Sequence, residues 1–356
     1  MKKVYLEKEF KRLMDSRIGQ PIAGLVATLS DKCDSVIGIN EQNIFYNQGV
    51  EGNSVVCLHR DEMKILMPNI SLFQNLRQLI PQNGSHLYMD WWPQSLEQVT
   101  LFQPADISKL NRLPKLKQLG LRYHDADLGA IRPIAEQIVT LAFHSAKEEK
   151  ELAHFKNLEL LTYGLQETDM SHFSSLTKLR RLFIERFSCG TLDGVEGCKA
   201  LEYLRIQSGD TNPLYDLSAL SKLSSLKNLT LVKNEVMDIS PLEKLPLESL
   251  ALSEMPLLDF SPLGGMKSLK ELNISNCMLD DLSVLEGLEQ LEKLTLRNTH
   301  VTDFTPLLKL PSLKELEGCN SWELPQELRE KLGIAESPKP PRIERRGFES
   351  RAVYDD

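Results

Sequence analysis

The sequence predicts an α/β solenoid, a horseshoe or arc with a parallel concave β-sheet, short helices on the convex side and capped ends. Two repeated patterns predict it. A pentapeptide of Asp, an apolar residue, Ser or Thr, a variable residue and Leu occurs five times, at intervals of 22, 21, 22 and 22 residues. A Leu-x-Leu pair, typical of a strand with one buried face, recurs at a similar interval. Units of this length bury a core only against their neighbours, so the fixed period indicates stacking.

The Leu-x-Leu pairs predict eleven strands, spaced 20 to 25 residues apart. In Leu229–Thr230–Leu231 the leucines point into the core and Thr230 points outward, because side chains alternate along a strand. The widest interval contains the turn-rich insertion Gly209–Pro213. A further strand is expected at Leu87–Met89. The eleven pairs begin at Val99, Leu119, Leu141, Leu161, Leu182, Leu204, Leu229, Leu250, Leu272, Leu294 and Leu316.

The pentapeptide predicts the start of a short helix in each unit. Ser240 is expected to be the N-cap and Pro241 the first helical residue, which satisfies or removes backbone N–H groups that would lack partners. Ser261–Pro262 and Thr305–Pro306 repeat this pair. The five pentapeptides begin at Asp216, Asp238, Asp259, Asp281 and Asp303, and weaker copies stand in register at Asp106, Asp127 and Asp169.

This pattern resembles the repeats of bacterial internalins and of the leucine-rich regulatory subunit of protein phosphatase 1. The resemblance is strong over residues 214–320 and weaker over 71–213, and it implies a leucine-rich repeat solenoid. The chain departs from the family at the Asn that follows the strand. Asn234 keeps it, whereas Met255, Cys277 and Thr299 replace it. We expect Cys277 to be a buried structural thiol.

The repeat pattern divides the chain into four parts. Residues 1–65 do not fit the repeat, so we expect an N-terminal cap or a small α/β domain there. Residues 66–320 hold about 11 to 12 repeat units. Residues 321–335 read as a C-terminal cap with a short helix from Pro325 to Gly333. Residues 336–356 are charged and poor in core residues, which predicts a flexible tail.

Composition favours a cytoplasmic protein. Charged residues interrupt any apolar leader near the N-terminus, and no stretch reaches the length of a membrane span. The six cysteines include no C-x-x-C pair, so we expect a reducing compartment and no metal cluster. The net charge of −8 disfavours nucleic-acid binding, although outward arginines leave it as a minor alternative. Pro93–Glu97 is similar to the opening of short bacterial repeats, which favours a bacterial origin.

We find no catalytic constellation in the sequence. The seven histidines stand in different repeat phases without H-E-x-x-H spacing, and there is no G-x-S-x-G elbow and no phosphate-binding loop. We therefore expect no enzyme activity, no metal and no cofactor. His144 is expected to point outward from its strand as a binding residue.

The outward strand positions supply the candidate site. In the central units they are rich in aromatic residues and Arg, whereas the last four units offer small and polar residues. Since Trp, Tyr and Arg dominate interface hot spots, we expect the partner to contact the strands from Val99 to Ile206. The alternative is that these aromatic side chains only cover their neighbours on the sheet. The predicted contact residues are Phe102, Arg122, His144, Arg181, Phe183, Glu185, Tyr203, Arg205 and Gln207.

Trp91 and Trp92 form a second candidate surface, because adjacent side chains on an extended segment face opposite ways and at most one of them is expected in the core.

The sequence thus favours a cytoplasmic protein that binds a folded protein partner on its concave face, as a specific inhibitor, immunity or regulatory protein. The alternatives are a general scaffold, or an enzyme or targeting protein in which residues 1–65 act. The oligomeric state stays open.

Overall fold

The computed structural model describes residues 92, 94–164 and 170–335, and it describes the backbone alone of residues 54–55, 78–79, 342–346 and 349–353. The chain forms two compact units, Met1–Asn212 and Pro213–Asp356. Their boundary falls within the turn-rich insertion Gly209–Pro213. The predicted boundaries at residues 65, 320 and 335 stay predictions.

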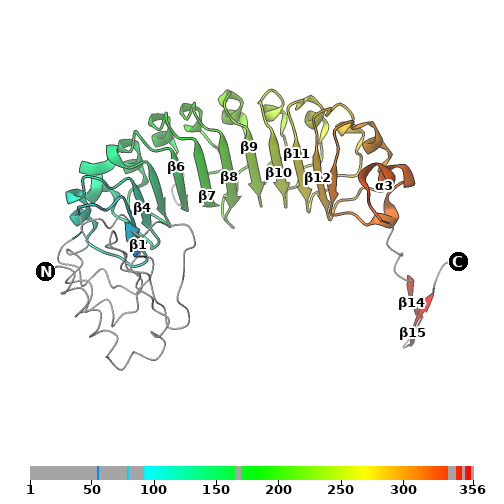
Figure 1. Cartoon of the computed structure of the whole chain (residues 1–356), viewed down its shortest axis with the longest axis horizontal. Coiled ribbons are helices and arrows are strands. Elements are labelled where there is room, and N and C mark those ends of the chain that lie inside the picture. Colours follow the sequence, from blue (N-terminus) through cyan, green and yellow to red (C-terminus); the bar gives the residue numbers. More distant parts are fainter. Residues whose placement is uncertain are drawn as a thin grey trace, which may run out of the picture. The chain divides into compact units, whose positions relative to one another are not determined.

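The first unit holds parallel strands in which each strand pairs with the next one in sequence. Short 3₁₀ helices connect the strands from β3 onward, and these helices all lie on the same side of the sheet (Figure 1). The elements are β1 (Ser54–Val55), β2 (Gln78–Leu79), β3 (Gln98–Leu101), η4 (Ile107–Arg112), β4 (Gln118–Leu121), η5 (Leu128–Gln137), β5 (Thr140–Phe143), η6 (Glu149–His154), β6 (Leu160–Gly164), η7 (Ser171–Ser175), β7 (Arg181–Phe187), η8 (Val195–Gly197) and β8 (Tyr203–Ser208).

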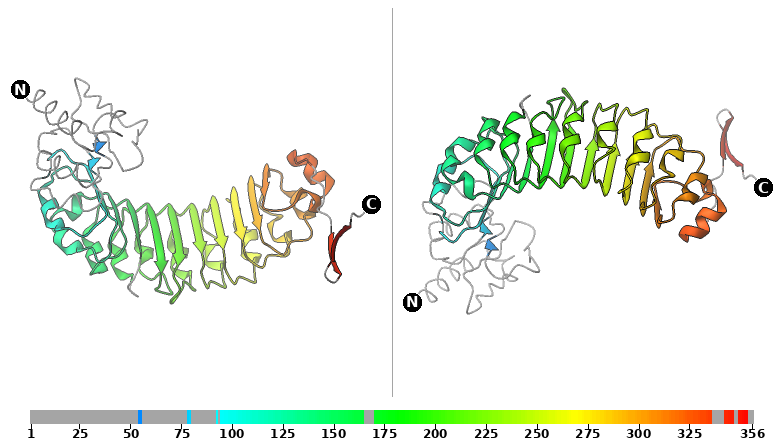
Figure 2. Two further views of the ribbon diagram at one scale, coloured as in Figure 1. Left: turned by 90° about the horizontal axis from the view of Figure 1, so that it is seen from below. Right: turned by 90° about the horizontal axis from the view of Figure 1, so that it is seen from above.

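The second unit repeats the same alternation of parallel strands and 3₁₀ helices, and Figure 2 shows its strands side by side. It ends in an α-helix, followed by an antiparallel pair, β14 and β15. The elements are η9 (Ser218–Lys222), β9 (Asn228–Val232), η10 (Ser240–Leu242), β10 (Ser249–Ser253), η11 (Ser261–Gly265), β11 (Glu271–Ser275), η12 (Ser283–Leu285), β12 (Lys293–Arg297), η13 (Thr305–Lys309), β13 (Glu315–Glu317), η14 (Ser321–Glu323), α3 (Gln326–Leu332), β14 (Arg342–Arg346) and β15 (Glu349–Val353).

All eleven strands predicted from the Leu-x-Leu pairs are present, as β3 to β13. The paired leucines stack in register, so that Leu250 lies beside Leu229 and Leu272, and all three are almost fully buried. Each repeat therefore adds one layer to a continuous apolar row, and the contact between layers stabilises a solenoid. The strand expected at Leu87–Met89 lies outside the described residues.

The recurring Asp, rather than the Ser, provides the hydrogen-bond acceptor at the start of the short helix in each of the five pentapeptides. The backbone N–H of Ser240 donates to Asp238 at 2.8 Å, and the Ser240 hydroxyl donates to the same carboxylate at 2.9 Å. The prediction that Ser240 is the N-cap was therefore wrong, because Ser240 is the first residue of η10 and its hydroxyl is a donor. Pro241, expected as the first helical residue, is the second residue of η10. A carboxylate is the stronger acceptor, since hydrogen bonds to an ionised group are charge-assisted.

The same hydrogen bonds recur along the chain and lower the pKa of several of these aspartates. The Ser hydroxyl is the leading cause at Asp216 and Asp281, and the backbone N–H is the leading cause at Asp259 and Asp303. The weaker copy at Asp106 follows the same rule, with Ser108 as its donor. The pentapeptide is thus a repeated turn in which an ionised Asp binds the residue two positions later.

The turn after each strand of the second unit contains a residue in the left-handed conformation. Lys233, Glu254, Asn276 and Asn298 have φ values of 57°, 55°, 53° and 52°. This conformation is uncommon for residues with a Cβ, and Asn is one of the types that tolerate it best. Cys277, next in the chain, is buried, and its thiol donates to the Ser275 carbonyl at 3.3 Å. The prediction of a buried structural thiol is confirmed.

The expected C-terminal helix is confirmed as α3, which ends at Gly333 in the left-handed conformation. Leu328 on this helix is fully buried, and the Lys331 ammonium donates to the Leu310 carbonyl at the end of the last repeat. The pair β14 and β15 lies in the segment for which composition predicted a flexible tail. That flexibility stays a prediction.

Candidate functional site

Two neighbouring strands of the first unit carry six of the nine predicted contact residues. In β7, Leu182 and Ile184 are buried, while Arg181 and Glu185 are exposed and Phe183 is half-buried. In β8, Leu204 and Ile206 are buried, while the residues between and beside them face outward. The alternation predicted from the sequence therefore holds, and it places these residues on one face of the sheet: Arg181, Phe183, Glu185, Tyr203, Arg205 and Gln207.

The strand register brings these six residues together in three pairs. Arg181 lies beside Tyr203, Phe183 beside Arg205, and Glu185 beside Gln207. The rings of Phe183 and Tyr203 also meet diagonally, with their centroids 5.0 Å apart and their planes at 31°. This contact agrees in part with the alternative that the aromatic residues cover their neighbours. Both side chains nevertheless keep an exposed part, and two exposed arginines flank them.

The other three predicted residues form a row at the ends of β3, β4 and β5. Phe102, Arg122 and His144 each follow the last residue of their strand, and those last residues are paired in register. The Phe102 side chain is 42% exposed. The ring of His144 meets the ring of His124 edge-on at 4.3 Å between centroids. Burial is the main cause that lowers the pKa of His144, and nearby His124 and Arg186 lower it further, so its imidazole is uncharged at neutral pH.

Gly164 at the end of β6 lies between these two groups, and the sequence analysis missed it. Its backbone N–H donates to the His144 carbonyl at 3.1 Å, and it is the register partner of Glu185. A Cβ at this position would lie 2.6 Å from the His144 carbonyl oxygen, so only Gly permits this close approach. The preceding outward residue of β6, Thr162, and its register partner Ala142 on β5 are small as well. The nine predicted residues thus form two groups on one sheet, with small side chains between them.

The charges on this face are uncompensated, in contrast to those of the second unit. Within the part of the chain that the structure describes, Arg122, Arg181 and Arg205 form no ion pair. In the second unit, Lys293 forms ion pairs with Glu315 at 2.8 Å and with Glu317 at 2.9 Å. Unpaired guanidinium groups can bind carboxylates in the bidentate geometry that Arg favours. We call the outward residues of β3 to β8 together with Phe102, Arg122 and His144 the arginine face.

The structure removes Trp92 from the second candidate surface, which the sequence placed at Trp91 and Trp92. The Trp92 side chain is only 7% exposed and belongs to the core, so it is not available as a contact residue. The expectation that at most one of the two tryptophans is buried stays a prediction. Trp91 lies outside the described residues.

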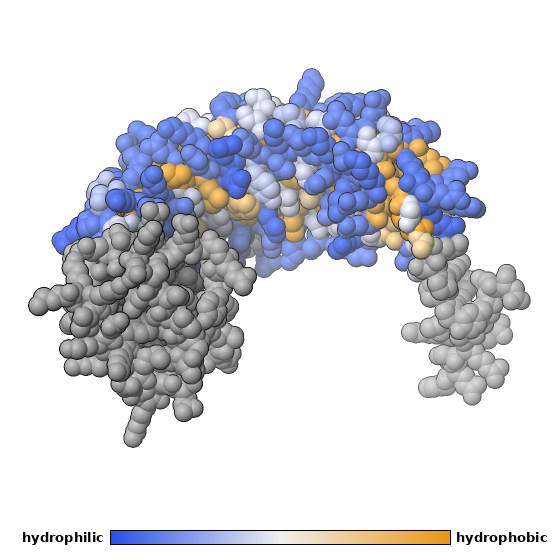
Figure 3. Space-filling view, viewed as in Figure 1, coloured by the Kyte–Doolittle hydropathy of each residue, from blue (hydrophilic) through white to orange (hydrophobic). Residues whose placement is uncertain are grey.

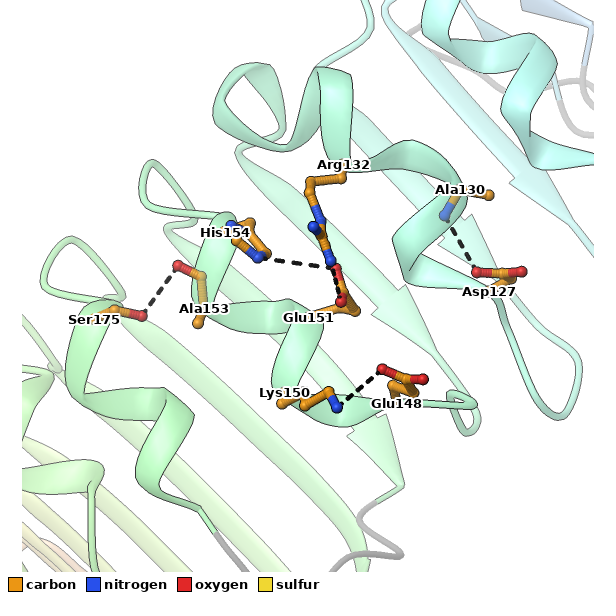
Figure 4. A network of polar contacts seen from close by, with 9 residues as sticks. All are labelled: Asp127, Ala130, Arg132, Glu148, Lys150, Glu151, Ala153, His154 and Ser175. Carbon is orange, nitrogen blue, oxygen red and sulfur yellow. Dashed lines mark hydrogen bonds and ion pairs between the residues drawn. The ribbon is translucent and has the colours of Figure 1, made fainter.

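A cluster of charged residues on the helical side of the first unit has a structural explanation. Arg132 on η5 donates two hydrogen bonds to the buried carboxylate of Glu151 on η6, one of them at 2.9 Å (Figure 4). His154 approaches the same carboxylate at 4.0 Å. The bidentate pair fills the Glu151 oxygens and ties neighbouring helices together. It leaves Glu151 committed to Arg132 rather than placed for proton transfer.

Among the described residues, no group of three His, Cys, Asp or Glu side chains is arranged to hold a metal ion. The described helices include none that is long and apolar enough to cross a bilayer. Cys189, Cys198, Cys277 and Cys319 are not in disulfides.

Solved structures share the architecture described above. One is an internalin (inlF) from Listeria monocytogenes, with 24% identity, a TM-score of 0.58, and coverage of 76% of this chain and 79% of that one. Another is a leucine-rich repeat protein from Leptospira interrogans, with 17% identity, a TM-score of 0.51, and coverage of 79% and 82%. No family model matches the sequence, and no curated protein matches it. At these identities the likeness establishes the fold, which confirms the predicted leucine-rich repeat solenoid.

Proposed function

We propose that this leucine-rich repeat protein binds a folded protein partner through the arginine face. The observation that carries the proposal is the combination of an aromatic pair, Phe183 and Tyr203, with arginines that have no partner within the described structure. Aromatic and Arg side chains contribute most of the binding energy at protein interfaces. Unpaired arginines on a protein of net charge −8 favour a partner whose contact surface is locally acidic.

Within this proposal, we favour a specific inhibitor, immunity or regulatory protein of the cytoplasm over a general scaffold. Six of the nine residues lie on two paired strands and the other three directly follow paired strands of the same unit, so the pairing fixes their spacing. Such an array suits one folded partner of matching shape. Binding sites on regular elements hold side chains more accurately than loops do. The alternative in which residues 1–65 carry an activity of their own stays a prediction.

The test is affinity capture from the native cell extract, with mass spectrometry, using the wild type and a Phe183→Ala, Arg205→Ala double variant. The extract is treated with nuclease so that nucleic acid cannot bridge the complex. The matched control is an Asn273→Ala, Arg297→Ala double variant, which changes outward residues of β11 and β12.

We expect one partner to bind the wild type and the control variant and to be lost from the Phe183, Arg205 variant. Circular dichroism must show that all three proteins are folded. A partner that both double variants retain would contradict the assignment of the arginine face. Many partners that all variants retain would favour the scaffold.

A further inference from the structure

Four of the five large hydrophobic side chains that are exposed in the described structure lie in the second unit. They are Tyr215, Met237, Leu258 and Met278, with exposed fractions of 56%, 65%, 75% and 57%. The first three each stand directly before the recurring Asp of their repeat, whereas Met278 stands three residues before Asp281, two positions out of that phase. We call these four residues the apolar strip. Most of the surface in Figure 3 is hydrophilic, and hydrophobic residues interrupt it.

The repeat holds the side chains of the apolar strip at a regular spacing. Beyond the strands, hydrogen bonds still connect the turns of neighbouring repeats. The Glu235 N–H donates to the Leu214 carbonyl at 2.8 Å, and the His300 N–H donates to the Leu279 carbonyl at 2.8 Å. Hydrogen-bonded neighbours of this kind lie about 4.8 Å apart. Tyr215, Met237 and Leu258 occupy equivalent positions of successive repeats and are therefore about 5 Å apart, spanning roughly 10 Å, whereas Met278 lies off this line.

This spacing matches one turn of an α-helix. A helix rises about 5.4 Å per turn, so side chains at positions i, i+4 and i+7 meet the repeats of Tyr215, Met237 and Leu258 with a small accumulated error. Alternate residues of an extended strand are about 6.7 Å apart and lose register by roughly 4 Å over the same two steps. The strip therefore fits the apolar face of a helix better than an extended segment.

The turns that carry the strip are strongly acidic. Segments 213–216, 233–238, 254–259 and 276–281 contain seven acidic residues, and their single basic residue is Lys233. The acidic residues are Asp216, Glu235, Asp238, Glu254, Asp259, Asp280 and Asp281. Asp216, Asp259 and Asp281 accept hydrogen bonds that favour the ionised form. An apolar row edged by carboxylates complements apolar side chains edged by Lys or Arg.

We propose that the apolar strip is a docking surface for a basic amphipathic helix of a partner protein, distinct from the arginine face. A second copy of this chain is disfavoured as the occupant, because pairing two strips would bring their acidic edges together. An anionic lipid surface is disfavoured for the same reason. The charge of the turns thus selects a basic occupant, and the spacing selects a helical one.

The test uses a fluorescent Lys/Leu peptide of about 18 residues, long enough to form a helix in water, with Leu on one helical face. Two control peptides are a scrambled sequence of the same composition and a version with Glu in place of Lys. Binding to the full chain is measured by fluorescence anisotropy at low and high salt. The protein variants are Met237→Ser with Leu258→Ser, and Phe102→Ser as the matched change of an exposed hydrophobic residue in the first unit.

We expect the Lys/Leu peptide to bind the wild type and the Phe102→Ser variant equally, and the double variant at least about tenfold more weakly. High salt should weaken binding, since the edge of the strip is ionic. Equal binding to the double variant, equal binding of either control peptide, or no binding of the Lys/Leu peptide would overturn the proposal. A concentration-dependent dimer in sedimentation that the double variant abolishes would also overturn it, because the strip would then pair two copies.

This result is independent of the arginine face. The Phe183→Ala, Arg205→Ala variant should bind the Lys/Leu peptide like the wild type. Loss of peptide binding in that variant would place the docking site elsewhere and contradict the strip.

Discussion

Two leucines of one repeat allow a matched test of which side chains form the core. Leu252 on β10 is fully buried, whereas Leu258, six residues later in the following turn, is 75% exposed. Replacing Leu by Ala removes three carbons, each of which contributes about 0.8 kcal/mol when buried, or about 2.4 kcal/mol together. The cavity left by Leu252→Ala raises the expected loss to about 3–5 kcal/mol. Leu258 buries about a quarter of its surface, so Leu258→Ala should cost about 0.6 kcal/mol or less.

The assay is urea denaturation of the full chain, followed by far-ultraviolet circular dichroism, with hydrogen exchange read on β10. With a denaturant slope of about 2–3 kcal/mol per M, Leu252→Ala should lower the midpoint by roughly 1–2 M, and Leu258→Ala by roughly 0.2–0.3 M. Hydrogen exchange is needed because a stacked array can lose one repeat before the rest unfolds. Equal shifts for the two variants would refute the assigned repeat register.

Two further predictions follow from the turns and the thiols. The aspartates whose pKa is lowered stabilise the fold above their unfolded pKa of about 3.9, and this contribution is lost as the pH falls below it through the folded pKa. The midpoint of urea denaturation should therefore fall less between about pH 5 and about pH 3 in Asp281→Asn than in the wild type. The neighbouring Asp280→Asn is the control. Burial raises the pKa of Cys198 to about 12 and also raises the pKa of Cys277. At mildly alkaline pH both thiols should react with a disulfide reagent far more slowly in the native than in the urea-unfolded protein, and rapid labelling of either in the native state would contradict its burial.

The sequence predicted the strands accurately because a solenoid expresses its tertiary contacts as a local period. Each leucine of a pair such as Leu250–Leu252 meets the equivalent residue of the next repeat, so one pattern specifies both the strand and its neighbour. The first strands were not predicted this way. β1 and β2 have two residues each, and the Leu-x-Leu pair does not mark them.

The error at Ser240 shows where sequence pattern alone is insufficient. A Ser before a Pro is a common helix start, and both residues were correctly placed at the turn. As an N-cap, the Ser240 hydroxyl would accept a hydrogen bond from an N–H two or three residues later. The N–H groups of Leu242 and Glu243 instead donate to backbone carbonyls, and the Ser240 hydroxyl donates to the Asp238 carboxylate. The Asp238 carboxylate is the preferred acceptor, because it accepts charge-assisted hydrogen bonds from both the backbone N–H and the hydroxyl of Ser240.

The outward placement of the candidate site could also be predicted, because it needs only the alternation of side chains along β7 and β8. The contact between Phe183 and Tyr203 could not, since it joins diagonal positions of two strands and depends on their register. Gly164 was missed for a related reason. Its role comes from its closeness to the His144 carbonyl on another strand, which no pattern within its own repeat reveals.

The two proposed surfaces require occupants of opposite charge. The arginine face offers guanidinium groups without partners, whereas the apolar strip is edged by seven acidic side chains. A contact region with charge of one sign cannot complement both, because like charges at an interface are repelled. Added salt weakens both contacts and cannot distinguish them. Reversing the charge of the occupant does distinguish them. Replacing Lys by Glu in the occupant should abolish binding at the strip and should not weaken binding at the arginine face.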